Sequence, residues 1–471
     1  MKNLNIKQKI AEILLACSNN QDIYSNIIKD FYTKGIDKPS IYIQSFGLSE
    51  IKEKDIQKKF KENKKKLVDY IKNIKSNLAI YKVLSCIYGS FLGDAIGAFC
   101  EFHASSNKNY KKIFHDPPVF QQLPGQITDD SEMAMSFAYA MMDNPLKETI
   151  DPNYLYFYYG AWSRSKPIDI GHTTIKAFSK FNFNEYHPKN KNFQNVFNEI
   201  FSNNYNSLSN GFLMRKSTFI AWFYHRFYRL VNDAFNPIND NKLLLDLYDK
   251  LKELSRIDNQ CTHPNLQTNA ASAIYCIMAL GAINGLRANN IIDKIVNLCQ
   301  DKNFIKKGED EQYISNFILF FYQKFKSHNF EFWNSFTNSQ SKDCITKTIG
   351  WYGHALKLTL YYLINFEQID EKKRFQQIME EICNLGGDTD TNCCIVGAVI
   401  GPLSGLQNFG SYFDKVIDVI PRNRYLFSIS IMLLYVLYLN KSNRNNELIE
   451  DKHYFLRTVL TLLYDDVEIN F

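Results

Sequence analysis

Acidic and hydroxyl side chains are concentrated in two short loops that each begin with glycine. The first loop is Gly125 to Ser131, GQITDDS, and the second is Gly386 to Asn392, GGDTDTN. Adjacent carboxylates repel one another, so such clusters cost stability unless a cation lies between them. Carboxylate and hydroxyl oxygens are hard ligands that suit Mg²⁺ or Mn²⁺. The two loops therefore predict a site for divalent cations.

Helix N-capping is the alternative interpretation of both loops, because Asp, Thr and Ser also favour the first turn of a helix. The oxygen-bearing residues that could converge on one centre are Thr128, Asp129, Asp130, Asp388, Asp390 and Thr391. A third acidic element, GDAIGAFCE, runs from Gly93 to Glu101 at the end of a helical pattern. Spacing alone does not show that these segments meet.

Apolar residues recur with helical spacing along most of the chain. One stripe runs from Ala79 to Leu92 and predicts an amphipathic helix. The same period returns in residues 133–141, 270–280 and 356–363. Glycines at 397, 401 and 405 indicate a helix that another helix approaches closely. Because hairpin patterns are nearly absent, the sequence predicts an all-α protein.

The net charge of +6 is carried mostly by one short segment. Residues 52–66 contain eight Lys against three acidic residues, and no Arg. We expect residues 1–78 to form a helical, Lys-rich extension of a main domain at 79–471. Lysines along one helix face are typical of a solvated surface, and the lack of Arg and of interleaved aromatic residues disfavours a nucleic-acid partner.

Other classes of protein are disfavoured by missing signals. The N-terminus lacks the apolar stretch of a signal peptide, and the longest lipid-like run, 426–439, is too short to span a bilayer. No CxxC or HxxxH pair occurs, which disfavours a zinc site. Dinucleotide, P-loop and GxSxG motifs are also missing. We expect a cytoplasmic protein without a membrane partner.

Five motifs occur in the order that is seen in the ADP-ribosylglycohydrolases. They are GSFLGDAIGAFCEF at 89–102, GQITDDSEMA at 125–134, SNGFLMR at 209–215, CTHPNLQTNAASAIY at 261–275 and GGDTDTNCCIVGAVIGPLSG at 386–405. The chain resembles this family over roughly residues 80–410. The resemblance implies an orthogonal all-α multi-helix bundle with two Mg²⁺ or Mn²⁺ ions in a central cleft.

Carried over motif by motif, the resemblance implies one ligand set for the two ions. The ligands would be Glu101, Thr128, Asp129, Asp130, Asp388, Asp390 and Thr391. Two divalent ions can bind ribose hydroxyls, orient a water and stabilise the oxocarbenium-like charge at the anomeric carbon. The catalytic base would be Glu101, Asp129 or Asp130, and the sequence does not choose among them.

The resemblance also implies a substrate side of the cleft. Ser209, Asn210, Gly211, Phe212, Leu213, Met214 and Arg215 would bind the diphosphate and distal ribose of ADP-ribose, with His263 and Asp169 beside them. A plain turn with Arg215 at the surface and a structural role for His263 are the alternatives that remain open. His172 and the run from Lys216 to Thr218 depart from the family pattern, so the acceptor is not defined.

We therefore expect a metal-dependent hydrolase. It would cleave the glycosidic bond between ADP-ribose and a modified arginine or serine side chain of a protein, or a related small ADP-ribose conjugate. The alternative is a catalytically silent relative that binds ADP-ribose or has a structural role. Retention of every acidic ligand type favours the enzyme. The sequence leaves open the linkage, the choice of metal, the oligomeric state and the role of residues 1–78.

Overall fold

Helices form the regular structure of the described part of the chain. The computed structural model describes residues 78–101, 127–143, 149–164, 167, 169–182, 193–236, 241–327 and 344–410. Within these ranges there is no strand, and β pairing is limited to one isolated antiparallel bridge between Ser209 and Trp351. The expected all-α fold is confirmed.

The helices differ greatly in length. The α-helices are α5 (Leu78–Gly97), α6 (Asp129–Asp143), α7 (Pro152–Ser163), α8 (His172–Phe178), α9 (Gln194–Asn204), α10 (Lys216–Arg226), α11 (Tyr228–Phe235), α12 (Asn241–Asn259), α13 (Leu266–Ile283), α14 (Ala288–Gln300), α15 (Lys302–Ile305), α16 (Glu309–Ser327), α18 (Tyr352–Asn365), α19 (Arg374–Leu385) and α20 (Thr389–Ser404). Single 3-10 turns are η2 (Asn210–Phe212), η3 (Phe366–Gln368) and η4 (Leu406–Asn408). The predicted stripes lie within α5, α6, α13 and α18.

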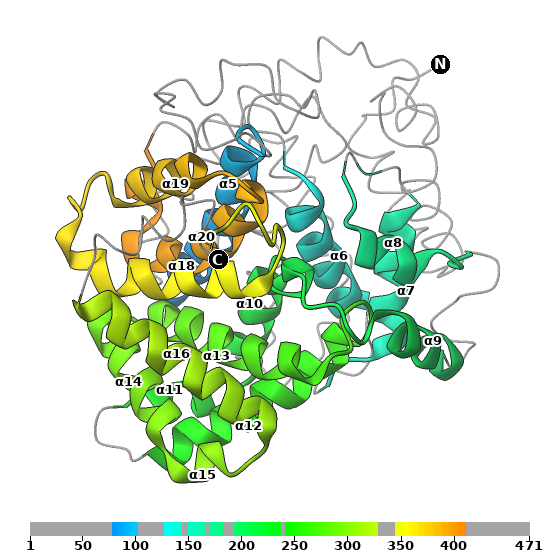
Figure 1. Cartoon of the computed structure of the whole chain (residues 1–471), viewed down its shortest axis with the longest axis horizontal. Coiled ribbons are helices and arrows are strands. Elements are labelled where there is room, and N and C mark those ends of the chain that lie inside the picture. Colours follow the sequence, from blue (N-terminus) through cyan, green and yellow to red (C-terminus); the bar gives the residue numbers. More distant parts are fainter. Residues whose placement is uncertain are drawn as a thin grey trace, which may run out of the picture.

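The helices surround α5 and α20, which lie side by side in the upper middle of Figure 1. α6 to α9 lie on one side of this pair, and α12, α14, α15 and α16 lie below it in the same view. α5 is buried on almost every face, so the prediction of an amphipathic helix is wrong for this element. A helix enclosed by other helices is apolar all round.

Two helices, α5 and α13, are long and apolar enough to cross a membrane by length and composition. In both, 89% of the apolar window is buried inside the protein. Such burial is typical of the core helices of a globular fold, whose apolar side chains contact neighbouring helices instead of lipid. The run at 426–439 and all but the last residue of the predicted extension at 1–78 lie outside the described residues.

Glycines allow α5 and α20 to pack backbone against backbone. A Cβ atom at Gly89 would lie 2.3 Å from the carbonyl oxygen of Gly397, and one at Gly93 would lie 2.2 Å from that of Cys393. The order of these contacts makes the two helices antiparallel. The predicted close approach is confirmed for Gly397 and for Gly401, where a Cβ atom would lie 2.1 Å from the Ser85 carbonyl oxygen. Gly405 ends α20 with a φ of +78°, and a Cβ atom there would lie 3.0 Å from the Tyr81 hydroxyl of α5 rather than from its backbone.

Candidate active site

The antiparallel packing brings the end of α5 to the start of α20. A Cβ atom at Gly97 would lie 2.2 Å from the carbonyl oxygen of Thr389, and the Thr389 hydroxyl donates a hydrogen bond of 2.7 Å to the Gly97 carbonyl. Glu101 follows α5 by one turn, and Asp388 and Asp390 stand at the start of α20. Acidic residues distant in sequence therefore meet at one end of this helix pair.

Asp94 fixes the start of α6 against the same end. Its carboxylate accepts hydrogen bonds from the backbone N–H groups of Thr128 (3.0 Å) and Ser131 (3.1 Å) and from both hydroxyls. A carboxylate is favoured there because N–H groups are exposed at a helix N-terminus. Burial raises the pKa of Asp94 to about 6, although these hydrogen bonds oppose the shift. The sequence analysis included Asp94 in the third acidic element, Gly93 to Glu101, but gave it no individual role.

Carboxylates from four segments form one acidic cluster. An oxygen of each of Glu101, Asp388 and Asp390 lies within 4.8 Å of the other two. The same holds for Asp129, Asp169 and Asp390. Because Asp390 belongs to both groups, the two groups are continuous. The structure thus brings together the two loops that the sequence could not place relative to each other.

Asp130 completes the cluster from its α6 side. Its carboxylate lies 3.1 Å from the Thr128 hydroxyl and accepts a hydrogen bond from the Thr391 side chain. The other oxygen, Oδ1, is buried and has no hydrogen-bond partner among the described residues. A buried carboxylate oxygen without a donor is costly. It therefore needs a proton or a cation.

Burial, reinforced by repulsion between neighbours, raises the pKa values of these carboxyl groups. The pKa of Glu101 rises to about 9, through burial and then through the charges of Asp388 and Asp169. The pKa values of Asp129, Asp130 and Asp390 rise well above the ordinary value, with burial as the largest cause. Among the described residues, no Lys, Arg or His side chain contributes to the shifts of these four pKa values. The hard-oxygen donor set and the uncompensated charge fit divalent cations.

N-capping does not explain Asp388. Asp388 is the N-cap residue of α20, but its side chain makes no capping hydrogen bond. Its Oδ2 atom instead accepts a hydrogen bond of 2.8 Å from the side-chain amide of Asn210. The capping interpretation is therefore wrong for this residue, and the Asp388 carboxylate faces the acidic cluster and the loop that contains Asn210.

The loop at 209–214 is held next to the acidic cluster by a short antiparallel contact. Ser209 pairs with Trp351, and the backbone N–H of Asn210 donates a hydrogen bond of 2.7 Å to the Gly350 carbonyl. Gly350 has a φ of +80°, and a Cβ atom there would lie 3.4 Å from Asp388 Oδ2. Gly350 is thus a site residue that sequence reasoning missed, because only its backbone is involved.

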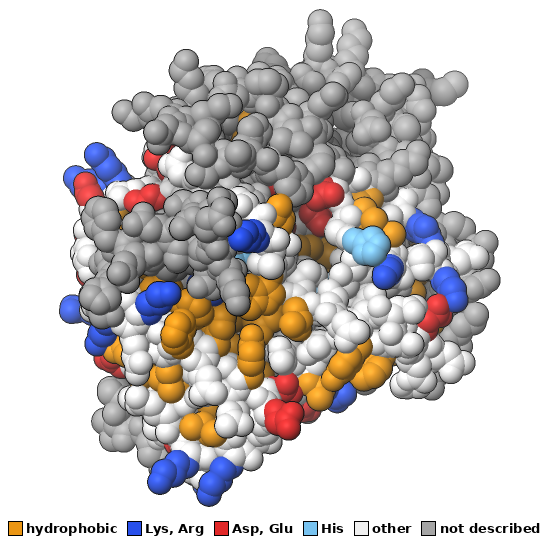
Figure 2. Space-filling model, viewed as in Figure 1, with side chains coloured by type: hydrophobic (Ala, Val, Ile, Leu, Met, Phe, Trp, Pro, Cys, Tyr) orange, Lys and Arg blue, Asp and Glu red, His pale blue; other side chains and the backbone are white. Residues whose placement is uncertain are grey.

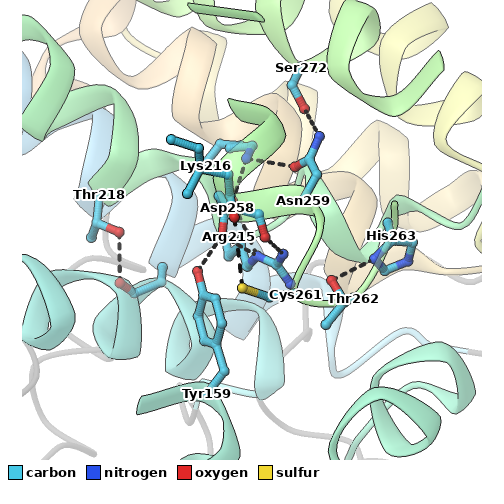
Figure 3. A network of polar contacts seen from close by, with 12 residues as sticks. Tyr159, Arg215, Lys216, Thr218, Asp258, Asn259, Cys261, Thr262, His263 and Ser272 are labelled. Atoms are coloured by element: carbon cyan, nitrogen blue, oxygen red, sulfur yellow. Dashed lines mark hydrogen bonds and ion pairs between the residues drawn. The ribbon is translucent and has the colours of Figure 1, made fainter. Parts of the chain in front are cut away.

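The predicted substrate-binding loop is mostly buried. Ser209 and Gly211 are half-buried, whereas Asn210, Phe212, Leu213, Met214 and Arg215 are buried. Arg215 is 0% exposed, pairs with Asp258 and covers the Tyr159 ring (Figure 3). The interpretation that puts Arg215 at the surface is wrong. Its guanidinium supports the loop from inside the protein.

His263 also supports this loop from inside. It is 0% exposed, and its Nε2 and Nδ1 atoms lie 2.7 Å from the Ser209 hydroxyl and 2.8 Å from the Thr262 hydroxyl. Burial, followed by the Arg215 charge, lowers the pKa of His263 to about 3, so its ring is neutral. A Cβ atom at Gly211 would lie 3.0 Å from His263 Cε1. The contacts of His263 therefore agree with the alternative that gives this residue a structural role.

Asp169 belongs to the acidic cluster, a place that the sequence analysis did not assign to it. The sequence analysis placed it on the substrate side, but the structure places its carboxylate with Asp129 and Asp390 in the acidic cluster. Its other contact is a hydrogen bond of 2.8 Å from the backbone N–H of Ile170. Asp169 comes from the loop before α8, and no spacing rule connects that loop with the other acidic segments. Only packing reveals this member.

The acidic cluster reaches the surface at Asp169 and Asp388, which are half-buried. Figure 2 shows acidic side chains beside a hollow in the upper half of the visible face, with apolar side chains along its lower edge. The buried members Glu101, Asp129 and Asp390 lie behind these two. Asp169 and Asp388 are therefore the more exposed carboxylates of the cluster.

Known proteins are similar to this chain in sequence and in fold. The family model for ADP-ribosylglycohydrolase matches residues 76–413. A protein of Acanthamoeba polyphaga mimivirus, L543, whose name assigns it provisionally to the ADP-ribosyl glycohydrolases, is 25% identical over 74% of this chain and 95% of its own length. The ADP-ribosyl-[dinitrogen reductase] glycohydrolase of Rhodospirillum rubrum is 27% identical over 21% of this chain and 34% of its own length.

A solved structure supports the fold separately. An ADP-ribosylglycohydrolase-related protein complex matches with a TM-score of 0.50 and 17% identity, over 78% of this chain and 99% of that chain. At this identity the match concerns the fold alone. The family match, however, spans every segment that builds the acidic cluster. The chain therefore belongs to the ADP-ribosylglycohydrolase family.

Proposed function

We propose that the protein is a metal-dependent hydrolase that releases ADP-ribose from a modified arginine or serine side chain, or from a related small conjugate. Membership of the family supports the hydrolysis of ADP-ribose conjugates in general. The observation that carries the metal-dependent proposal is the convergence of carboxylates from four segments on one site, where no Lys, Arg or His of the described residues offsets their charge. A structural protein has no need of such a costly arrangement.

In the proposed reaction, the residues of the acidic cluster would bind the cations and accept a proton from water. Glu101, Asp129, Asp130, Asp388 and Asp390, with Thr128 and Thr391, would hold the cations. Bound cations would neutralise the carboxylates and stabilise the charge that develops on the sugar. Water attacks the anomeric carbon, and its proton passes to one of the carboxylates Glu101, Asp129 or Asp130. The bond to the side-chain nitrogen or oxygen breaks, and the departing atom takes up a proton.

The loop at 209–214 fits the anionic part of such a substrate. Ser209 and Gly211 are its most exposed members, and Asn210 connects it directly to Asp388. Backbone N–H groups in a tight turn favour phosphate oxygens. Recognition through the backbone also explains why a buried Arg215 is compatible with diphosphate binding.

Release of ADP-ribose from arginine-modified and serine-modified proteins tests the proposal. We expect activity with Mg²⁺ or Mn²⁺ and none with EDTA. Asp388→Asn and Asp129→Asn should each lower kcat/KM by at least about a hundredfold, because each removes a charged ligand. Asp249→Asn is the matched control, since Asp249 is an exposed acid that pairs with Lys307. Metal-replete protein that binds ADP-ribose but releases none from either linkage would contradict this proposal. That result would support the catalytically silent alternative.

A further inference from the structure

Two buried cations share one buried carboxylate where the 209–214 loop enters α10. Arg215, Lys216 and Asp258 are each 0% exposed, and Figure 3 shows both cations directed at Asp258. We call these three residues the Asp258 cluster. We propose that the Asp258 cluster positions the 209–214 loop and thereby sets the affinity for ADP-ribose, while bond cleavage depends on the acidic cluster. The identity of the ligand rests on the proposed function.

The contacts of the Asp258 carboxylate leave little freedom to either cation. Asp258 Oδ1 accepts hydrogen bonds from Arg215 Nε at 3.2 Å and from the Tyr159 hydroxyl at 2.7 Å, and Oδ2 pairs with Lys216 Nζ. Lys216 Nζ also donates a hydrogen bond of 2.9 Å to Asn259 Oδ1. Removing two cations from water is expensive, and one carboxylate compensates only part of that cost. Such a cluster is better explained by the single local conformation that it imposes than by a gain in the stability of the fold.

The Asp258 cluster ties the end of the loop to the turn that follows α12. Asp258 and Asn259 are the last residues of α12. The Asn259 carbonyl accepts hydrogen bonds from the backbone N–H groups of Thr262 at 3.0 Å and His263 at 2.6 Å. Lys216 therefore bonds to the residue whose backbone shapes the turn carrying His263.

The same turn holds the beginning of the loop. His263 Nε2 lies 2.7 Å from the Ser209 hydroxyl, so residues 258–263 contact the first residue of the loop and the two residues that follow it, Arg215 and Lys216. Between these contacts, Asn210 donates its hydrogen bond to Asp388. If Lys216 lost its contacts, only Arg215 would still connect the end of the loop to Asp258, while the ligands of the acidic cluster kept their contacts. The expected defect is in substrate binding rather than in the chemical step.

Lys216→Met tests this role, because Met has a similar length but neither charge nor donor. We expect amide hydrogen exchange in residues 210–214 to become faster by about tenfold or more. The Kd for ADP-ribose and the KM should rise by about tenfold, with kcat changed less than about threefold and metal affinity unchanged. Lys216→Gln, which keeps a hydrogen-bond donor, should lie between the wild type and Lys216→Met.

Lys252→Met is the matched control, since Lys252 lies on α12, the helix that carries Asp258, but pairs with Glu311 of α16. It should leave loop exchange and ADP-ribose affinity unchanged. Wild-type exchange and affinity in Lys216→Met, or a fall in kcat at constant KM, would overturn the inference. If Lys216→Met does not fold, Lys216→Gln is judged by the same two measurements. Failure of the wild type to bind ADP-ribose would overturn the proposed function, while the exchange rates would still decide whether Lys216 positions the loop.

Discussion

In the proposed metal site, protons and cations would compete for the same oxygens of the acidic cluster. Burial is the main cause of the raised pKa values of Asp129, Asp130 and Asp390, and neighbouring carboxylates add to it. A cation requires deprotonated ligands, so its binding must displace these protons. At the scale of single residues, burial and mutual repulsion raise the free energy of the metal-free carboxylates. The same two effects favour the binding of positive charge.

The competition predicts how pH changes stability. Between their ordinary and raised pKa values, the folded metal-free protein binds more protons than the unfolded chain, so its unfolding free energy falls as pH rises. For Glu101 this window runs from 4.5 to about 9. The gain in Tm on replacing EDTA by Mg²⁺ should therefore be larger near about pH 8 than near about pH 5.5.

Thermal unfolding at both pH values, with and without Mg²⁺, checks this prediction. Asp129→Asn should reduce the gain at the higher pH, because it removes one charged ligand. The exposed-site control Asp249→Asn should behave as the wild type does. Equal gains in Tm at the two pH values would contradict a shared site for protons and cations.

The α5–α20 pair is the element on which the acidic cluster depends. It is joined through glycine backbones, so the distance between Glu101 and Asp390 is set by main-chain contact rather than by adaptable side chains. Asp94 lies on α5, and its hydrogen bonds fix the start of α6. Ligand geometry is thus a consequence of how closely two helices approach.

Gly93→Ala should separate these helices. The added Cβ would lie 2.2 Å from the Cys393 carbonyl oxygen, which is backbone and cannot rotate away. We expect a loss of about 2 kcal/mol or more in unfolding free energy by urea titration, together with weaker Mn²⁺ binding. Gly171→Ala is the stability control, since a Cβ there meets nothing within 4 Å. Unchanged stability and metal affinity in Gly93→Ala would show that the contact can relax.

At the scale of the whole molecule, the described site draws its residues from 94 to 391. The family match covers 76–413, which contains all of them. The Lys-rich extension therefore has no assigned part in the acidic cluster, and its separation from the main domain stays a prediction. In the sequence, most of the excess positive charge lies in residues 52–66, which are not among the residues that form the described site.

Deletion of residues 1–75 should therefore leave metal-dependent release of ADP-ribose within about twofold of that of the full chain. The measurement is kcat/KM on the same modified protein. A loss of about tenfold or more with unchanged Tm would assign part of the extension to substrate binding. Salt-dependent binding of nucleic acid that disappears with the deletion would give the lysines a separate role.

The sequence by itself determined the chemistry and the helices. Residue types in TDD and GGDTDT specify hard-oxygen ligands, and helical periodicity depends only on neighbours a few positions apart, so both can be read locally. Only the tertiary structure decided that Asp169 joins the acidic cluster, that Arg215 points inward, and that Asp94 and Gly350 shape the site. These features arise from contacts between helices and loops far apart in the chain. No local pattern records them, because they exist only once α5 and α20 have packed.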